Sequence, residues 1–273
     1  MRTLVLNYVN MPKFLKKPMW RFWHNWITSR DKGNIELRFM NYGYAGLDGN
    51  GATVELDSED ESERFCAQLY DFAASHADIS GKDVLEVGCG RGGGASYLTR
   101  YHEPRSYVGI DLSENGIRFC NTYHRVDNLR FVRGSAESLP FEDEQFDAIV
   151  NVESSRAYND IRSFFAEAYR VLRPGGSFLL TDMRLAEYVD TLDEQVREAG
   201  FQREAYYNIT DNVVRALELD DERRRRLMGR KIPKFAIKMF GEFAGVRGSD
   251  RYESFANGSM QYVSYLLRKP ETA

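Results

Sequence analysis

VLEVGCGRGGGASYL, residues 84–98, is the stretch that decides the fold of this chain of 273 residues. Its first four residues are mainly apolar and predict a buried parallel strand. Gly88, Gly90 and Gly92 then allow the backbone to turn sharply and to lie close to a ligand. A helix follows, and its first amides can bind polar ligand atoms. The stretch therefore predicts a strand, a turn and a helix, with a ligand at the turn.

The acidic residue Glu86 stands near the end of the predicted strand, just before the glycines. A bare glycine-rich turn is weak evidence, because sites for dinucleotides share it. A carboxylate at this position repels a pyrophosphate, whereas it attracts the amino group of an amino-acid-like ligand. The turn therefore favours S-adenosylmethionine over a dinucleotide.

From residue 82 onward, apolar strands alternate with amphipathic helices, as in a parallel sheet that is covered on both faces. Strands are expected at residues 84–87, 107–111, 129–133, 147–152 and 177–182, and two more, at 201–207 and 261–268, close the sheet. Asp111 ends the second strand 23 positions after Gly88. An acid at that place suits a ribose diol. We predict an α/β fold with a doubly wound, seven-stranded, mostly parallel sheet.

Composition narrows the class of protein. The chain has 37 basic and 41 acidic residues, so no overall field favours nucleic acid as a partner. Its three cysteines stand singly without metal-ligand spacing, which predicts a reducing compartment and no metal site. No apolar run approaches the roughly 18 residues of a membrane span, and the N-terminus lacks the apolar centre of a signal peptide. We expect a cytoplasmic protein without stable membrane insertion.

The segments that flank the core carry apolar side chains at helical spacing. In residues 11–27, this spacing predicts a helix that packs on the domain, covers an apolar substrate pocket or, third, lies on a membrane surface. Residues 210–258 read as a helical insertion, whose apolar stripe packs back on the domain, lids a ligand or forms a contact in a homodimer. The charge run 220–226 is expected to be a solvated helix face. A capping box at residues 58–61 predicts the start of another helix.

In these residues the chain resembles the class I S-adenosylmethionine-dependent methyltransferases, in the small-molecule branch with the sterol, tocopherol and ubiquinone-pathway enzymes. It is similar to phthiotriolone dimycocerosates and polyketide O-methyltransferases, which act on hydroxyls. The pieces that match are VLEVGCG (84–90), GGGASYLTR (92–100), GIDLS (109–113), FVRGSAESLPF (131–141), FDAIVNVESS (146–155) and YRVLRPGG (169–176). The resemblance implies a Rossmann-like methyltransferase domain over residues 58–273, preceded by an N-terminal helical and aromatic segment over residues 1–57.

The resemblance also implies which residues bind S-adenosylmethionine. They lie at the strand ends and in the aromatic loop 41–44, which is similar to a loop that closes over the methyl donor, or is simply packed. The expected set is Tyr42, Tyr44, Glu86, Gly88, Cys89, Gly90, Asp111, Leu112, Ser135, Ala136, Glu137 and Asn151.

Within this set, each part of the cofactor has an expected partner. Glu86 and the glycines of the turn hold the methionine moiety, and Asn151 contacts its amino-acid end. Asp111 takes the ribose hydroxyls, Leu112 packs on the adenine, and Ala136 and Glu137 meet the edge of the adenine. The family usually has an aspartate in place of Ser135, so a hydrogen bond to the adenine amino group weakens here or shifts to Glu137.

The catalytic candidates lie just past the fourth predicted strand. Methyl transfer from a sulfonium is an in-line displacement, and an alcohol acceptor also has to lose its proton. Related O-methyltransferases often have a histidine where this chain has Arg156. Glu153 is the expected base, if burial raises its pKa, or else only positions the substrate. Tyr158 and His24 are further candidates.

The resemblance implies an O-methyltransferase that acts on a hydroxyl of an apolar, lipid-like or polyketide-like molecule in secondary metabolism. Two alternatives stay open. One is a C- or N-methyltransferase on a small-molecule scaffold, which the missing histidine makes more credible. The other is a homologue that binds the cofactor without methylating and works as a cyclase, scaffold or sensor.

Overall fold

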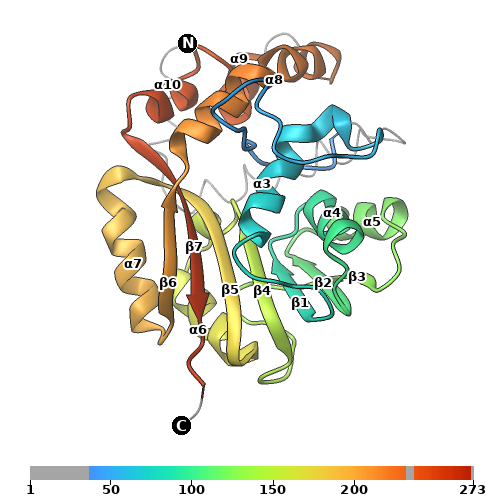
Figure 1. Cartoon of the computed structure of the whole chain (residues 1–273), viewed down its shortest axis with the longest axis vertical. Coiled ribbons are helices and arrows are strands. Elements are labelled where there is room, and N and C mark those ends of the chain that lie inside the picture. The colour runs from blue at the N-terminus through green and yellow to red at the C-terminus, as the bar shows by residue number, and fades with distance from the viewer. Residues whose placement is uncertain (1–36, 232–236, 272–273) are drawn as a thin grey trace.

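A computed structural model describes residues 37–231 and 237–271 of the chain, and a seven-stranded sheet forms its centre (Figure 1). The strands are β1 Asp83–Val87, β2 Ser106–Asp111, β3 Leu129–Arg133, β4 Phe146–Val152, β5 Leu172–Leu185, β6 Gln202–Asn208 and β7 Met260–Arg268. Their order in the sheet is β3-β2-β1-β4-β5-β7-β6. Strands β1 to β5 pair in parallel, and β7 runs antiparallel to both β5 and β6. The predicted fold class is confirmed.

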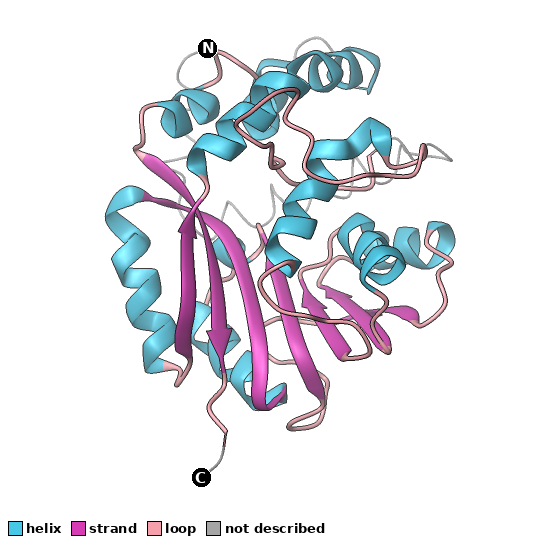
Figure 2. Ribbon diagram, in the orientation of Figure 1, coloured by secondary structure: helices cyan, strands magenta, loops and turns pink. Residues whose placement is uncertain are grey.

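Helices cover both faces of the sheet, as Figure 2 shows. The α-helices are α3 Arg64–Ala74, α4 Gly93–His102, α5 Glu114–Tyr123, α6 Ile161–Val171, α7 Val189–Glu198, α8 Thr210–Lys231, α9 Ile237–Ala244 and α10 Asp250–Ala256. The described residues also form three short 3-10 helices, η1 Glu61–Glu63, η2 Ser155–Ala157 and η3 Ala186–Tyr188. Two separate apolar clusters fill the space between sheet and helices. Val84 packs in the cluster with α3, α4 and α5, and its neighbour Leu85 packs in the cluster with α6 and α7, because successive side chains of a strand point to opposite faces.

Strand β5 is longer than the sequence predicts. The sequence predicts it over residues 177–182. In the structure α6 ends at Val171, and β5 begins at the next residue, where Leu172 pairs with Phe146. At its other end β5 continues to Leu185, because β7 pairs with it as far as Met260. A partner strand distant in sequence therefore sets the length of β5.

The helix that the sequence predicts at residues 58–61 is present as η1 followed by α3, but the Glu61 carboxylate of the expected capping box binds Arg64 instead. Asp60 precedes η1, but its side chain makes no capping hydrogen bond. Its carboxylate instead lies 2.9 Å from the guanidinium of Arg38 and 2.8 Å from that of Arg100. Charge-assisted contacts of this kind are about twice as strong as neutral hydrogen bonds. The Asp60 carboxylate therefore binds the two arginines and not the backbone amides at the start of the helix.

The charge run 220–226 is also not a solvated face throughout. Asp220 and Arg224 of α8 are buried, and Nε of Arg224 donates to the Asp220 carboxylate at 2.9 Å. Figure 1 shows α8, α9 and α10 together at one end of the sheet, beside the loop that precedes α3. That loop covers one side of α8, because Asn212 of α8 and Ala45 exchange hydrogen bonds. Part of the predicted apolar stripe, residues 232–236, lies outside the described residues.

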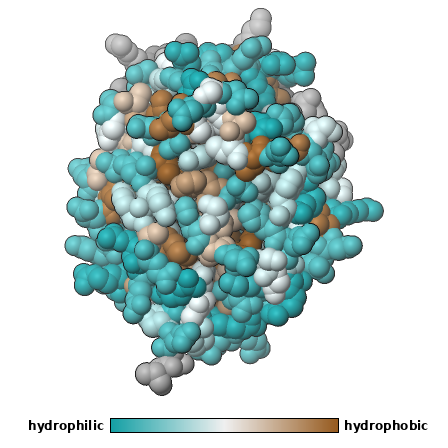
Figure 3. Space-filling model, in the orientation of Figure 1, coloured by the Kyte–Doolittle hydropathy of each residue, from teal (hydrophilic) through white to brown (hydrophobic). Residues whose placement is uncertain are grey.

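The described part of the N-terminal segment, residues 37–57, contains neither helix nor strand. The predicted helix within residues 11–27 lies outside the described residues. Apolar side chains on the face drawn in Figure 3 are scattered among polar ones and are more frequent in its upper and middle parts. Among the described helices, none combines the length and the hydropathy that crossing a membrane requires. A cytoplasmic location and a homodimer stay predictions.

Candidate active site

The glycine-rich turn lies at the point where the strand order reverses, between β1 and β4. Ligands of open α/β sheets bind in the crevice at such a point, outside the carboxyl ends of the strands. Gly88, Gly90 and Gly92 have φ angles of 82°, 56° and 74°, which favour glycine as predicted. A Cβ added to Gly88 would overlap Ser154, whereas one added to Gly90 meets nothing closer than the Met40 sulfur at 4.0 Å. The turn is thus packed at its first glycine and open beside its second.

Asp111, at the end of β2, presents a fixed carboxylate next to this turn. Its Oδ2 accepts from the backbone amide of Gly90 at 2.9 Å, and its Oδ1 accepts from the amide of Ser113 at 2.8 Å. The hydroxyl of Ser113 caps α5 by accepting from the amide of Gly116. Leu112, between the acid and the cap, is 54% exposed. A held carboxylate beside an exposed apolar side chain can bind a diol and a flat ring.

Glu86 lies deeper than the resemblance implied. Its carboxylate is fully buried and accepts one hydrogen bond from the Tyr70 hydroxyl at 2.8 Å and another from the Tyr107 hydroxyl at 3.0 Å. Burial raises the pKa of Glu86 to about 7, although the two tyrosines act against this. A direct contact between Glu86 and a ligand stays a prediction.

The buried state of Glu86 predicts how stability depends on pH. Between its ordinary pKa of 4.5 and its folded pKa of about 7, the folded protein holds a proton that the unfolded chain has lost. The contribution of Glu86 to the free energy of unfolding therefore falls as the pH rises through this window. Glu86→Gln should remove this part of the slope in urea unfolding measured across the window. Glu222→Gln, at an exposed site on α8, is the control. An unchanged slope in Glu86→Gln would contradict the expectation.

A second buried group lies under the turn. The amide of Asn151 donates from Nδ2 to the Val87 carbonyl at 2.8 Å and to the Tyr158 hydroxyl at 3.0 Å. The Tyr158 hydroxyl also lies 2.7 Å from that of Ser154. Burial raises the pKa of Tyr158, so this phenol stays protonated at neutral pH. The carbonyl oxygen of the Asn151 side chain is buried without a hydrogen-bond partner among the described residues. It offers an acceptor for an N–H group of a ligand.

The residues that follow β3 lie at the same edge of the sheet. Ser135 and Ala136 are half-buried, and the Ser135 hydroxyl accepts from the amide of Glu137 at 3.2 Å. The Glu137 carboxylate points toward the start of α6, where it accepts from the backbone amides of Asn159 at 2.7 Å and Asp160 at 3.2 Å. Glu137 thus already holds the segment before α6. Cys89, within the glycine turn, is buried.

The two tyrosines of the aromatic loop point in different directions. Tyr42 is buried, and its ring packs edge-on against Phe255 of α10 at 5.5 Å. Tyr44 stacks on Phe72 of α3 with ring centroids 4.4 Å apart. The backbone, rather than either ring, reaches the carboxyl edge, because the amide of Tyr42 donates to the Glu153 carboxylate at 2.6 Å. The ring of Tyr44 therefore packs against α3, and its contact with the cofactor stays a prediction.

Glu153 is the centre of a buried polar cluster just past β4. Its side chain is only 4% exposed, and its φ of 50° is unusual for a residue other than glycine. Besides the Tyr42 amide, Oε1 accepts from the Tyr262 hydroxyl of β7 at 2.7 Å. Burial raises the pKa of Glu153, while Arg156 and these two donors act in the opposite direction. A carboxylate with a raised pKa, close to the glycine turn, is suited to accept a proton from a bound molecule.

Arg156 binds two acids at once. Its guanidinium contacts the Glu153 backbone carbonyl, lies 3.3 Å from the buried carboxylate of Asp182 and lies 3.8 Å from that of Glu153. Burial acts to raise the pKa of Asp182, but Arg184 and Arg156 outweigh it and lower that pKa. Asp182 therefore stays ionised and holds Arg156 in place. Since an arginine does not release its proton at neutral pH, Arg156 cannot replace the absent histidine as a base.

Sequence reasoning missed two members of this cluster, Asp182 and Tyr262. Asp182 lies near the carboxyl end of β5, and the position of an acid at a strand end is a signal that could have found it. Tyr262 gave no such signal, because it lies 109 positions from Glu153 on a strand that reaches the site only by antiparallel pairing. The candidate His24 lies outside the described residues.

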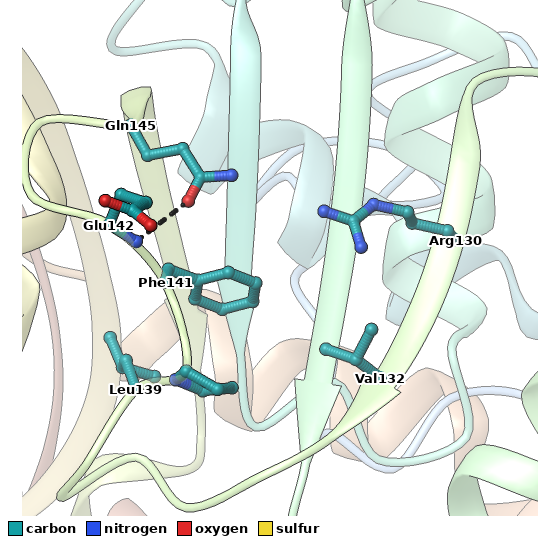
Figure 4. A pocket seen from close by; sticks show the side chains of 7 residues that line it. Arg130, Val132, Leu139, Phe141, Glu142 and Gln145 are labelled. Atoms are coloured by element: carbon teal, nitrogen blue, oxygen red, sulfur yellow. Dashed lines mark hydrogen bonds between the residues drawn. The ribbon is translucent and has the colours of Figure 1, made fainter.

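A separate groove of about 580 Å³ runs along the edge strand β3. Figure 4 shows its side chains, with the Gln145 amide oxygen accepting from the backbone of Glu142 at 3.1 Å. The groove is lined by Arg130, Val132, Leu139, Pro140, Phe141, Glu142 and Gln145. It shares no residue with the carboxyl edge described above, so it is not the candidate site. Within residues 37–231 and 237–271, no group of three or more metal-ligating side chains comes together.

The sheet order and the glycine turn define a class of protein, the Rossmann-like methyltransferases. Residues 85–180 match the family described as methyltransferase domain. Among solved structures, the cyclase SpnF aligns with a TM-score of 0.69 over 93% of this chain and 95% of its own, at 20% identity. A likeness at this low identity shows the shared fold.

Relatives of known name show the family to which the chain belongs. The chain is 39% identical over 253 residues to the phthiotriol/phenolphthiotriol dimycocerosates methyltransferase of Mycobacterium tuberculosis, and the match covers 93% of both chains. It is 38% identical over 247 residues to the fatty-acid O-methyltransferase of Mycolicibacterium smegmatis, which covers 90% of this chain and 88% of the relative. The chain belongs to this family of S-adenosylmethionine-dependent methyltransferases.

Proposed function

We propose that the protein transfers a methyl group to a hydroxyl oxygen of an apolar, lipid-like or polyketide-like molecule in secondary metabolism, in the cytoplasm. The observation that carries the proposal is the buried carboxylate of Glu153 beside the glycine turn, with a raised pKa and two fixed donors. The names of the two curated relatives, one acting on dimycocerosates and one on a fatty acid, support a lipid-like acceptor.

The residues at the carboxyl edge fit S-adenosylmethionine. Asp111 would accept from the ribose hydroxyls, and the exposed Leu112 would pack on the adenine, near Ser135 and Ala136. The free side-chain carbonyl of Asn151 would accept from the ammonium group, and the open space beside Gly90 would admit the methionine chain. When bound, the cofactor supplies a methyl group activated by a positive sulfur. The protein has to bind it, orient the acceptor and exclude water.

Glu153 would accept the proton of the acceptor hydroxyl. Its carboxylate is held by the Tyr42 amide and the Tyr262 hydroxyl, both on Oε1, which leaves Oε2 next to Arg156. Burial keeps its pKa above the ordinary value, which makes it a better proton acceptor than an exposed glutamate. Tyr158 would serve as a hydrogen-bonding group under the turn rather than as a base, because its pKa is raised.

Tyr262 should lower the pKa of the Glu153 carboxylate, the proposed base. Tyr262→Phe removes a hydrogen bond that stabilises the ionised form of Glu153, so the pKa of Glu153 should rise and the acidic limb of the kcat profile should move to higher pH. At neutral pH kcat should fall about tenfold, because hydrogen bonds to charged groups are worth about 1.5 to 3 kcal/mol. Steady-state kinetics across a pH series measures both effects.

Tyr265→Phe is the matched control for Tyr262→Phe. Tyr265 lies on the same strand and is also buried, but its hydroxyl has no hydrogen-bond partner within the described part of the chain. Its removal should leave kcat and the pH profile unchanged. Equal effects of the two substitutions would mean that Tyr262 acts only through packing.

A C-methyltransferase is the second candidate, and the presence of Arg156 in place of a histidine favours it, since carbon nucleophiles stabilised as enolates need less help from a base. Three acceptors separate the possibilities, each incubated with S-adenosylmethionine that carries a deuterated methyl group. Methyl ricinoleate offers a hydroxyl without a free carboxyl, oleic acid offers a carboxyl without a hydroxyl, and methyl 3-oxooctadecanoate offers a carbon that readily forms an enolate.

The proposal expects a deuterated methyl ether of methyl ricinoleate in the mass spectrum. If oleic acid yields a methyl ester and methyl ricinoleate yields no ether, the acceptor is a carboxylate and not a hydroxyl. Methylation of methyl 3-oxooctadecanoate at the carbon between its two carbonyl groups would support the second candidate. Cofactor binding in calorimetry without any methylated product would point to a homologue that does not methylate.

A further inference from the structure

Arg224 lies in the helical insertion, far along the chain from the predicted base, yet its contacts reach the same loop. It is buried in α8, where its Nε donates to the Asp220 carboxylate at 2.9 Å. Its Nη1 donates to the backbone carbonyl of Ala244, the last residue of α9, at 2.9 Å. Its Nη2 donates to the carbonyls of Asn41 at 3.3 Å and Tyr42 at 3.1 Å. One guanidinium thus joins α8, the end of α9 and the aromatic loop.

The peptide group between Asn41 and Tyr42 connects Arg224 to Glu153. Its carbonyl oxygen accepts from Arg224, and its N–H donates to Oε1 of Glu153 at 2.6 Å. A trans peptide is planar, so the direction of the carbonyl fixes the direction of the N–H. A cation at the oxygen also polarises the group and strengthens the N–H as a donor, since hydrogen bonds in a chain reinforce one another.

We propose that Arg224 is a positioning residue that sets the place and the proton affinity of Glu153 through this peptide group. The proposal rests on the proposed function, in which Glu153 is the base. The Asn41 side chain supports the same geometry, because it donates to the Cys66 carbonyl at 3.1 Å and accepts from the Gly43 amide at 2.9 Å. The helical insertion thereby contributes to the chemistry as well as covering the sheet.

Several other groups face Glu153 and have to stay unchanged in a test. They are Arg156 of η2, Asp182 of β5, Tyr262 of β7, the hydroxyl of Tyr42 in the aromatic loop and, at longer range, Tyr70 of α3. Arg156, Asp182, Tyr262 and Tyr70 have no hydrogen bond to Arg224 in the described structure, so the hydrogen-bonded link from Arg224 to Glu153 runs through the loop that carries Tyr42. Asp220 also keeps a partner when Arg224 is replaced, because Arg223 donates to both of its oxygens at 2.6 Å.

The next residue of α8, Arg225, is a matched control. Its Nε donates to Asp221, four positions earlier, at 2.7 Å, and its Nη2 donates to the Arg247 carbonyl at 2.7 Å. It therefore repeats the contacts of Arg224 with an aspartate and with a backbone carbonyl at or after the end of α9, but it is exposed and has no hydrogen bond to the aromatic loop. Comparing the two arginines isolates the contact with Asn41 and Tyr42.

The experiment measures the pKa of Glu153 by carbon NMR of protein labelled at glutamate carboxyls, with Glu153→Gln to assign the signal. Loss of the Tyr42 donor destabilises the ionised carboxylate, so Arg224→Gln should raise this pKa, and Arg225→Gln should leave it unchanged. With methyl ricinoleate, kcat should fall about tenfold in Arg224→Gln, while KM for S-adenosylmethionine stays within about twofold.

Arg224→Lys keeps a cation beside Asp220 but lacks the planar fork that reaches three carbonyls, so it should change the pKa of Glu153 in the same direction. If Arg224→Gln does not fold, the pKa of Glu153 is compared between Arg224→Lys and the wild type. A folded Arg224 variant with the wild-type pKa at Glu153 would overturn the proposal. The NMR result needs no acceptor. If Glu153→Gln keeps full activity, the proposed base is wrong, and the pKa comparison still decides whether Arg224 acts on Glu153.

Discussion

Glu153→Gln is expected to lower the rate of methyl transfer to a hydroxyl acceptor by about two to four orders of magnitude, the usual contribution of a general base. Glutamine has nearly the same shape, and its carbonyl oxygen can still accept from the Tyr42 amide and the Tyr262 hydroxyl. The fold and cofactor binding should therefore survive. Only the capacity to take a proton is lost.

The measurement is kcat with methyl ricinoleate at saturating cofactor, across a pH series. In the wild type, activity should fall as the pH drops through the raised pKa of Glu153, because the base becomes protonated. Glu153→Gln should lack this acidic limb. Glu144→Gln is a close control, since Glu144 is also a glutamate with positive φ, at 52°, on an exposed loop. A Glu153→Gln variant that retains more than about a tenth of the activity would rule out general-base catalysis by this residue.

Gly88→Ala should weaken binding of S-adenosylmethionine by at least about a hundredfold, or prevent folding of the turn. Two independent reasons combine. A left-handed φ of 82° is strained for alanine, and the new Cβ would overlap Ser154 and lie 2.9 Å from the Tyr158 hydroxyl. Something at the base of the site has to shift. A misplacement of about 1 Å in an active site can lower the reaction rate about a hundredfold. We expect the loss of cofactor affinity to be at least as large.

Calorimetry with S-adenosylhomocysteine, together with thermal unfolding, checks this expectation. Gly81→Ala separates backbone strain from steric overlap, because Gly81 has a φ of 67° but open space where an added Cβ would lie. It should lose some stability from strain and keep its affinity for the ligand. If a folded Gly88→Ala variant binds S-adenosylhomocysteine with unchanged affinity, the turn is not part of the binding site.

Much of the fold could be predicted because its signals are local. The apolar residues of β1 alternate between two faces, and glycines mark the turn that follows, so neither needs knowledge of distant residues. The cap of α5 by Ser113 and that of α6 by Asp160 are local as well, and the structure contains both. The alternation of strands and helices then predicts a mostly parallel sheet with helices on both faces.

The site could be predicted only where its residues stand at strand ends. Asp111 and Glu153 were predicted in that way, and the structure places both at the carboxyl edge of the sheet. The contacts that define the environment of Glu153 join it to Tyr42 and Tyr262, which are 111 and 109 positions away. The burial of Arg224 and of Asp220 depends on the aromatic loop, which no helical periodicity in the charge run reveals. Such pairs are set by tertiary packing rather than by local propensity.

The central claim is that Glu153 takes the proton of an acceptor hydroxyl at the glycine turn. A crystal structure with S-adenosylhomocysteine and methyl ricinoleate tests it most directly. We expect the acceptor hydroxyl within hydrogen-bonding distance of the Glu153 carboxylate, the ribose at Asp111 and the sulfur near the turn at Gly88 and Gly90. An acceptor hydroxyl bound away from Glu153, with that carboxylate still held only by Tyr42 and Tyr262, would contradict the claim.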